Sequence, residues 1–422
     1  MVDVWLPYGD TEVCLRVKMR NLNAVLKPDE KPMINNLKAK IGEALREPVG
    51  TDPLSEMAKP GERVAIAVKC PMPGDCEVMG VILKVIIHEL NSSGVKPEGV
   101  RVIATYDPLH TNWPSYLKRM IQECDELKEM KVIIHNPDGK NNIHVGKTAQ
   151  GTKIDLNRAF VEADLKVTAG FIRPHPYAGY AGGGDVILPG VSGKKTIQQY
   201  HSKVFHPKAV RGLLDENPMY IDSMEASKLA GVNFAVDVIR DHRGDVVGVF
   251  AGELERSFKE GVGLLDSACR VHVKKGADVL FLSPGGKPFD SNLYETCLGL
   301  DIAPGILGRN GALVLVGECR EGYGDQEFFN LVKSSKGFKE VERALRRRFT
   351  GGRYVAHILT EALRRFRVIL VSALPDYYTV EAFKLRPSRT VNEALRFALD
   401  ITGRDADIMA VTHGRYVIPT QG

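Results

Sequence analysis

The sequence predicts an α/β protein of two domains, each containing a mostly parallel sheet. Short apolar runs alternate with helical segments along the chain, and this rhythm restarts near residue 276. Such β-α-β alternation is typical of parallel sheets covered by helices. The length of 422 residues also favours at least two domains.

The first part of the chain supplies the strands that matter most for function. The run RVAIAVK at 63–69 is apolar without alternation, as expected for a strand buried on both faces. In order we expect a strand at 11–17, a helix over 34–45, a strand at 63–69, a helix over 77–90, a strand at 100–105, a helix over 114–127 and strands at 131–135 and 165–172. In open parallel sheets, functional groups follow the carboxyl ends of strands. The segments after Lys69, Thr105 and Ile172 are therefore the candidate site loops.

The second part begins with a hairpin and a helix and then returns to the α/β rhythm. We expect strands at 234–240 and 245–250, a helix over 253–268, and strands at 277–282, 312–316, 368–372 and 407–411. The predicted division is a first domain over 1–275 that carries the site, a second over 276–408, and a tail, 409–422, that packs back on the first. The active site is expected in the cleft between the domains.

Composition excludes several classes of protein. The 57 Lys and Arg against 52 Asp and Glu give a net charge of +5, too small for a nucleic-acid binder. Apolar runs are shorter than the roughly 18 residues of a membrane helix, and the N-terminus lacks the pattern of a signal peptide. Seven scattered cysteines do not form a disulfide framework. We expect a cytoplasmic protein that acts on a small molecule without nucleic-acid or membrane partners, as a monomer or a dimer.

Residues 171–201 form the most unusual segment of the chain. His175 stands between two prolines that stiffen its backbone, and the glycines at 182–184 follow. Glycine loops can present backbone amides to a phosphate. His201 ends the segment on an expected helix. Neither a dinucleotide fingerprint nor a P-loop fits the spacing, so these generic motifs do not name a reaction.

The segment resembles the nickel-pincer-nucleotide lactate racemase family. That family carries a His-x-x-Ala-Gly-x-x-Gly-Gly loop, then Leu-Pro-Gly, then a nickel-binding histidine. Here these motifs are 175–183, 188–190 and His201. Further matches at Leu6–Gly9 and Ser283–Gly286 extend the resemblance over essentially the whole chain.

The resemblance implies a racemase or epimerase of 2-hydroxy acids. Its cofactor, a nickel-pincer nucleotide, is a pyridinium mononucleotide whose nickel would take His201 as fourth ligand; imidazole suits this metal. The reaction would move a hydride from the substrate's α-carbon to the cofactor and back, while histidines handle the hydroxyl proton. His175 matches the first catalytic histidine. His110 is the candidate for the second, with Asp107 as the rival occupant.

The resemblance also implies contacts with the cofactor. The residues it assigns to cofactor binding are Tyr177, Gly182, Gly183, Gly184, Asp185, Pro189 and Tyr294. Asp185 stands where the family has a lysine that tethers the cofactor, so we expect non-covalent binding. A carboxylate there would also repel anionic groups of the cofactor. Lys194 and Lys195 are the candidates for a compensating charge.

The substrate side departs from the family at three positions. The family's arginine after the first core strand is missing beyond Lys69, and Glu295 and Leu298 replace a glutamine and a lysine. Arg173, Lys69 and Lys287 are the candidate replacements for carboxylate binding. We therefore expect a 2-hydroxy acid other than lactate. The charge of Glu295 favours a polyhydroxy tail over a second carboxylate.

Two alternatives remain open from the sequence. The first is an isomerase or oxidoreductase that uses the same hydride chemistry with a different outcome. The second is a catalytically silent protein that only binds the cofactor, which the lost arginine and lysines favour. The retained His175 favours racemisation, because storage alone needs no base.

Overall fold

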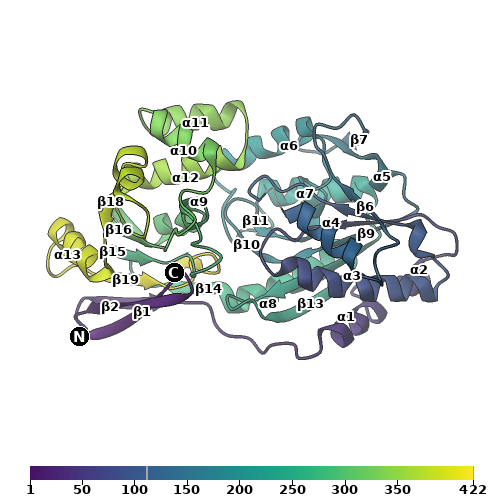
Figure 1. The fold of residues 1–422 in the computed structure, drawn as a ribbon, viewed down its shortest axis with the longest axis horizontal. Coiled ribbons are helices and arrows are strands. Elements are labelled where there is room, and N and C mark those ends of the chain that lie inside the picture. Colours follow the sequence, from purple (N-terminus) through teal and green to yellow (C-terminus); the bar gives the residue numbers. More distant parts are fainter. Residues whose placement is uncertain (111–112, 422) are drawn as a thin grey trace. The chain divides into compact units, whose positions relative to one another are not determined.

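The computed structural model describes residues 1–110 and 113–421. The chain forms two compact units. We call Glu30–Ser267 the central unit, and Met1–Asp29 together with Ala268–Gly422 the split unit. Figure 1 shows that each unit contains a sheet flanked by helices. The α/β class and the mostly parallel sheets agree with the prediction.

The central unit is built on a six-stranded sheet. In spatial order its strands are β13 (Val246–Gly252), β12 (Phe234–Arg240), β9 (Leu165–Phe171), β4 (Val64–Val68), β5 (Val100–Ala104) and β6 (Lys131–Ile134). All neighbours are parallel except the β12–β13 pair, which forms the predicted hairpin edge. Because β9, β4 and β5 are parallel neighbours, their carboxyl ends meet at one edge of the sheet.

Helices and two short antiparallel pairs complete the central unit. The helices are α1 (Leu37–Arg46), α2 (Leu54–Met57), α3 (Asp75–Ser92), α4 (Trp113–Glu123), α5 (Arg158–Val161), α6 (Lys194–His201), α7 (Pro218–Ala230) and α8 (Leu254–Cys269). The pairs are β7 (Asn142–Lys147) with β8 (Lys153–Asn157), and β10 (Arg173–His175) with β11 (Gly179–Ala181). Helix α3 buries Ile82 and Ile86 in the same apolar cluster as Ile66 of β4. Every residue of β4 is buried, as expected for a parallel strand covered on both faces.

The split unit contains a second six-stranded sheet in which all neighbouring strands are parallel. In spatial order its strands are β18 (Arg386–Ser388), β17 (Arg367–Val371), β16 (Leu307–Val316), β15 (Ala277–Leu282), β19 (Ile408–Val411) and β3 (Leu22–Leu26). An antiparallel hairpin, β1 (Val2–Tyr8) with β2 (Thr11–Val17), and a parallel pair, β14 (Arg270–Val273) with β20 (Ile418–Gln421), accompany it. The helices are α9 (Leu293–Cys297), α10 (Gln326–Ser334), α11 (Phe338–Arg347), α12 (Gly351–Arg365) and α13 (Val391–Thr402).

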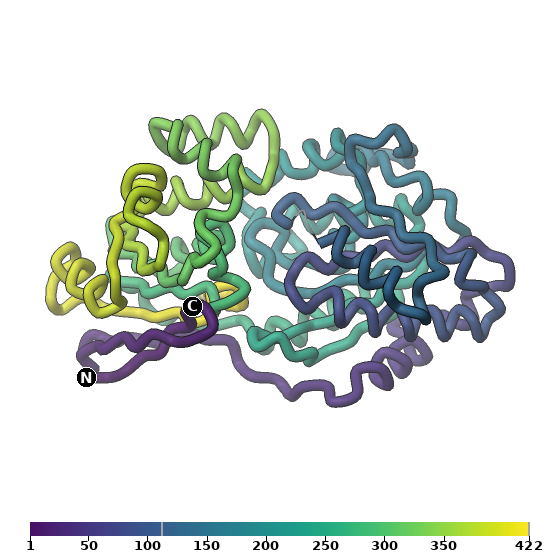
Figure 2. Tube along the Cα trace, viewed as in Figure 1, coloured from purple at the N-terminus to yellow at the C-terminus, as the bar shows by residue number. Residues whose placement is uncertain are grey.

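The units differ from the predicted division at both ends of the chain. Strand β3 pairs with β19, so the first 29 residues group with the C-terminal residues and not with residues 30–267. Leu6 and Leu15 of the hairpin are buried in the apolar cluster of this second sheet. Figure 2 shows the N-terminal segment in purple beside the yellow C-terminal segment. Residues 409–421 finish β19 and form β20, which pairs with β14.

Two compositional predictions can be compared with the structure. Across residues 1–110 and 113–421, no helix has the length and apolarity that crossing a bilayer requires. All seven cysteines lie in this part of the chain, and none of them forms a disulfide.

Candidate functional site

The candidate site begins at the carboxyl ends of three neighbouring strands of the central unit. Lys69 directly follows β4, Asp107 and His110 follow β5, and His175 ends β10, two residues beyond the turn from β9. Backbone hydrogen bonds continue the sheet into these loops, from Lys69 N to Ala169 O over 3.0 Å. The structure thus brings together the three segments that the strand pattern singled out.

His175, Tyr177 and His201 form the aromatic part of the site. The ring of Tyr177 lies edge-on to both histidines, at centroid distances of 4.3 Å from His175 and 5.8 Å from His201. Its hydroxyl lies 3.3 Å from His201 Nε2. The side chain of Asn217 donates to the Tyr177 carbonyl over 2.9 Å and fixes this turn. A single tyrosine therefore bridges the two histidines that the sequence proposed for different roles.

His201 is oriented in the way expected of a metal ligand. It is the last residue of α6, and its Nδ1 lies 2.9 Å from the carbonyl of Ile197, one turn earlier. Donation by Nδ1–H leaves the lone pair on Nε2, the arrangement that positions histidine ligands in metal sites. Burial lowers the pKa of His201 to about 3. The ring is therefore neutral, as metal ligation requires.

The described part of the chain was compared with the ligand sets that proteins use for metals. Among the residues that the structure describes, no group of three or more His, Cys, Asp or Glu side chains is arranged to hold a metal ion. A metal at His201 would have to bring its other ligands with it.

His175 has the opposite arrangement of ring nitrogens. Its Nδ1 accepts a hydrogen bond from the backbone N–H of Ala178 over 3.1 Å and a longer one from Tyr177 over 3.5 Å. The ring proton is thereby assigned to Nε2. Burial, and next the charge of Lys69, hold the pKa of His175 well below its usual value. His175 is therefore a neutral side chain that donates at Nε2.

Lys69, Asp107 and Asp185 form what we call the buried ion cluster. The Lys69 ammonium lies 3.1 Å from Asp107 Oδ2 and 2.9 Å from Asp185 Oδ2, and all three residues are buried. Burial works against ionisation of Asp107, but Lys69 and His110 outweigh it and hold the pKa of this carboxyl well below its usual value. The cluster contains two carboxylates and one ammonium.

This cluster corrects two expectations from the sequence. Lys69 is held between two carboxylates and is not an open anchor for a substrate carboxylate. The charge that compensates Asp185 comes from Lys69 and not from the lysines of α6: Lys194 pairs at the surface with Asp138 over 2.7 Å. Sequence reasoning treated positions 69 and 185 separately, although their charges are complementary.

His110 is oriented by Asp107. The carboxylate Oδ1 accepts hydrogen bonds from the backbone N–H groups of Leu109 and His110, over 2.8 and 3.1 Å. His110 Nδ1 lies 3.6 Å from the same oxygen. When Nδ1 carries the proton, Nε2 is the basic atom. Asp107 therefore favours the proton on Nδ1 of His110 and leaves Nε2 as the basic atom. The assignment of His110 as the second acid–base group stays a prediction.

Arg173, two residues before His175 on β10, is held by a carboxylate that sequence reasoning missed. Asp75, at the start of α3, is fully buried and lies 2.8 Å from Arg173 Nη2 and 2.9 Å from Arg240 Nη1. The guanidinium carbon of Arg173 lies 5.4 Å from the centre of the Phe171 ring. In the sequence Asp75 looks like an ordinary acidic residue in a first helical turn. Its two arginine partners are more than 90 residues away.

The glycine loop is packed closely against the rest of the central unit. A Cβ on Gly182 would meet the carbonyl oxygen of Phe171 at 3.0 Å, and one on Gly183 would meet the ring of Phe258 at 2.7 Å. Gly184 is similarly close to Ser223. The amide of Gly183 donates to Asp237 Oδ1 over 3.2 Å. These glycines are required by packing, while their role in binding a phosphate stays a prediction, as does that of Pro189.

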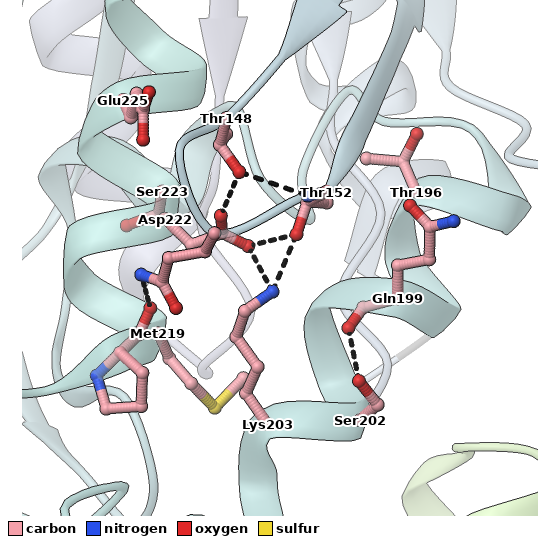
Figure 3. A network of polar contacts seen from close by, with 12 residues as sticks. Thr148, Thr152, Thr196, Gln199, Ser202, Lys203, Met219, Asp222, Ser223 and Glu225 are labelled. Atoms are coloured by element: carbon pink, nitrogen blue, oxygen red, sulfur yellow. Dashed lines mark hydrogen bonds and ion pairs between the residues drawn. The ribbon is translucent and has the colours of Figure 1, made fainter.

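A polar network holds the segment that follows His201. Figure 3 shows buried Asp222 of α7 surrounded by Thr148, Thr152 and Lys203. The carboxylate accepts hydrogen bonds from the two threonines over 2.6 and 2.7 Å and from the Lys203 ammonium over 2.8 Å. Lys203 also donates to Thr152 over 2.6 Å. The network joins α7, the β7–β8 turn and the residues after α6, and the sequence offered no local signal for it.

Three predicted site residues belong to the split unit. Tyr294 of α9 is buried with its ring edge-on to Phe328, and Leu298 is buried in the core. Glu295 Oε2 lies 3.3 Å from Arg415 Nη1. Because Arg415 compensates this charge, the argument from Glu295 for a polyhydroxy tail no longer holds. The contribution of these residues to the site stays a prediction.

Comparison with known proteins identifies the chain's relatives. Family models described as the lactate racemase N-terminal domain and the lactate racemase C-terminal domain match residues 8–212 and 272–419. The chain is 26% identical over 430 residues to a lactate racemase of Thermoanaerobacterium thermosaccharolyticum, covering 99% of both chains. It is also 26% identical to that of Lactiplantibacillus plantarum, covering 99% of this chain and 100% of the relative.

Solved structures agree with the sequence matches. The lactate racemase apoprotein of T. thermosaccharolyticum superimposes with a TM-score of 0.86 at 25% identity, covering 99% of this chain and 100% of that one. A Thermotoga maritima protein at 13% identity, with a TM-score of 0.65, shares the fold. Two family models and full-length relatives thus agree on one assignment. The chain belongs to the lactate racemase family and is an isomerase of the racemase class.

Proposed function

We propose that this protein is a nickel-pincer-nucleotide-dependent racemase or epimerase of a 2-hydroxy acid other than lactate. The observation that carries the proposal is the opposite orientation of two histidines beside Tyr177, the half-buried His175 and the buried His201. His201 would bind a metal through Nε2, in place of its present 3.3 Å contact with the Tyr177 hydroxyl. The Nε2–H of His175 would donate to an oxygen of the substrate.

The residues present fit the cofactor. His201 would hold the nickel, and Tyr177 lies beside it. When bound, the cofactor supplies a reversible acceptor for the hydride of the substrate's α-carbon. Lys69 compensates part of the negative charge that Asp185 would place near the cofactor's anionic groups. Asp185 has no amine, so we keep the proposal that binding is non-covalent.

The chain itself divides the proton chemistry between two histidines. His110, with Nδ1 toward Asp107, takes the hydroxyl proton on Nε2 and returns it. His175 donates a hydrogen bond from Nε2–H to the reacting oxygen while that oxygen is a carbonyl. To act as a base, His175 would have to move its proton to Nδ1 and lose the hydrogen bond from Ala178.

Arg173 is the proposed anchor of the substrate carboxylate. Asp75 fixes its guanidinium, and such pre-organisation makes carboxylate binding stronger and more directional. Lys69 is engaged by two carboxylates and is not used for this purpose. The family's arginine and lysine are absent on the substrate side, which supports a substrate other than lactate.

The test is a panel of enantiopure 2-hydroxy acids incubated with cofactor-loaded protein and separated by chiral chromatography. We expect one member of the panel to racemise or epimerise faster than lactate. Accumulation of the 2-keto acid without inversion would instead indicate a one-sided oxidoreduction. No turnover of any member, with nickel bound at one equivalent, would contradict a catalytic role.

A further inference from the structure

Two thiols are in contact next to the candidate site. Cys70 follows Lys69 at the end of β4, and Cys76 is the second residue of α3. Their sulfur atoms share a hydrogen bond over 3.2 Å, six positions apart in the sequence. The sulfurs of a disulfide lie about 2.05 Å apart, so these two need to approach by only about 1 Å to form one. The pair is therefore arranged for oxidation to a disulfide.

The burial of the pair determines which oxidant suits it. Cys70 has no exposed surface, and Cys76 exposes 3% of its area. Burial, and next the hydrogen bond with Cys76, raise the pKa of the Cys70 thiol well above its usual value. Such thiols react slowly with bulky reagents. A compact hydroperoxide suits this access, and once it has oxidised one sulfur, the second thiol is already in contact with it.

Each cysteine is the neighbour of a residue that makes buried ion pairs. Lys69, before Cys70, lies between two carboxylates. Asp75, before Cys76, holds Arg173 over 2.8 Å. Movement of the two sulfurs toward each other would move the backbone that carries these charges. The state of the thiols is therefore coupled to the arginine that we propose as the carboxylate anchor.

We propose that Cys70 and Cys76 are a modification site, where a hydroperoxide forms a reversible disulfide that disturbs the ion pair of Asp75 with Arg173. Hydrogen peroxide transfers one oxygen to the more accessible Cys76 sulfur, giving a sulfenic acid and one water. The Cys70 sulfur then attacks this sulfur, and the hydroxyl leaves with the Cys70 proton as a second water. The two thiols lose two electrons and two protons, and the peroxide takes up both.

Formation of the disulfide is tested by peptide mapping of the full chain, and needs neither cofactor nor substrate. The protein is treated with hydrogen peroxide, alkylated in urea and digested with trypsin without reductant. Both cysteines lie in the tryptic peptide 70–84. We expect this peptide to be lighter by two hydrogen atoms and free of alkyl groups, and to regain two alkylation sites after dithiothreitol. The half-buried Cys14 and Cys124 show whether the oxidant has acted. If these two are oxidised while peptide 70–84 is still alkylated twice, the inference is overturned.

The variant Cys70→Ser tests the order of the two steps. It removes the attacking thiol, so oxidation should stop at a Cys76 sulfenic acid that dimedone traps. Cys319→Ser is the matched control, because it removes a buried thiol whose sulfur contacts Thr296 Oγ1 at 3.4 Å. This control should form the disulfide as the wild type does. Equal dimedone labelling of Cys76 in the wild type and in Cys70→Ser would overturn the inference. If Cys70→Ser does not fold, the peptide map of the wild type still decides.

A second measurement tests the effect on the ion pair, and this part rests on the proposed function. Weakening of an oriented, charge-assisted contact predicts that oxidation lowers turnover of the 2-hydroxy acid by at least about 10-fold. Dithiothreitol should restore turnover, and Cys70→Ser should not show the reversible loss. A complete disulfide with unchanged turnover would overturn the coupling to Arg173. No turnover before oxidation would contradict the proposed function, while the peptide map would still decide the modification site.

Discussion

The site histidines His175 and His201 illustrate how hydrogen bonds to the backbone determine what a side chain can do. Nδ1–H of His201 donates a hydrogen bond to the carbonyl of Ile197, one turn earlier. Nδ1 of His175 instead accepts a hydrogen bond from the backbone N–H of Ala178, three residues later. The same residue type is therefore a ligand at one position and a donor at the other. Replacement of His201 and replacement of His175 should therefore impair different properties, nickel binding in the first case and turnover in the second.

His201→Ala should abolish nickel retention, because the protein's one proposed metal ligand is removed. His175→Ala should retain nickel and reduce turnover by at least about 100-fold, since a hydrogen-bond donor to the reacting oxygen is lost. Elemental analysis measures the first effect and chiral chromatography the second. Full nickel content in His201→Ala, or near-normal turnover in His175→Ala, would contradict the respective role.

Asp237 beneath the glycine loop predicts a pH dependence of stability. Burial, with the charge of Asp185 adding to it, raises the pKa of Asp237 from 3.8 to about 7. The folded protein thus holds a proton that the unfolded chain has already lost, and stability contributed by this group declines as the pH rises from about 4 to about 7. Its Oδ2 has no hydrogen-bond partner, which agrees with a protonated side chain.

Asp237→Asn mimics the protonated form and should remove this dependence. The free energy of unfolding of the variant minus that of wild type should rise by about 3 kcal/mol from pH 5 to pH 8. This follows from about 1.4 kcal/mol per pH unit over the range in which Asp237 titrates in the folded protein. Urea unfolding at both pH values measures the difference. The same stability difference at pH 5 and pH 8 would show that Asp237 does not titrate in this range.

At the scale of elements, α6 shows how a ligand residue is kept in position. His201 ends the helix, and two residues later Lys203 is held by buried Asp222 of α7. At the other end of the helix, Lys194 pairs with Asp138 at the surface. The two ion pairs lie at the two ends of α6 but differ in burial, so they should contribute different amounts to the free energy of unfolding.

Asp222→Asn should destabilise the protein by about 3 kcal/mol, because it leaves the Lys203 ammonium with a weakened buried partner. It should also speed the loss of nickel from loaded protein, since the residues after His201 are released. Asp138→Asn, which removes the surface partner of Lys194 on α6, should change stability by less than about 1 kcal/mol. Similar changes in stability and in nickel loss in both variants would show that the Asp222 network contributes no more than the surface ion pair.

At the scale of the whole molecule, the first 29 residues belong with the last 155. Strand β3 adds to the edge of the split unit's sheet through β19, and the hairpin before it contributes Leu6 and Leu15 to the apolar core. Pairing of β3 with β19 and burial of the two leucines together join the first 29 residues to the C-terminal part of the split unit.

Deleting residues 1–29 should weaken the split unit selectively. We expect hydrogen-exchange protection to fall in β15 and β19, because an edge strand and two buried leucines are lost. The amides of β4, β5 and β9 in the central unit provide the internal control and should keep their protection. Uniform loss of protection in both units would show that they unfold together.

The sequence alone determined much of this protein. Continuous apolar runs identified β4, β5 and β9, because strands buried on both faces carry their signal locally. The strand-end rule then selected the loops of Lys69, His110 and His175 before any contact was known. The spacing from the proline-flanked histidine to His201 carried the resemblance to lactate racemases.

Other features were decided only by the tertiary structure. The pairing of Lys69 with Asp185 spans 116 residues, and neither residue carries a mark of its partner in the local sequence. Strand β3 found its neighbour β19 at the opposite end of the chain, which reversed the expected grouping of the first residues. Ring-nitrogen roles in His175 and His201 depended on backbone hydrogen bonds in a folded loop and helix. The periodicity of apolar residues indicates which face of a helix or strand is buried. Ion pairs, strand order and histidine tautomers depend instead on which groups, distant in the sequence, become neighbours when the chain folds.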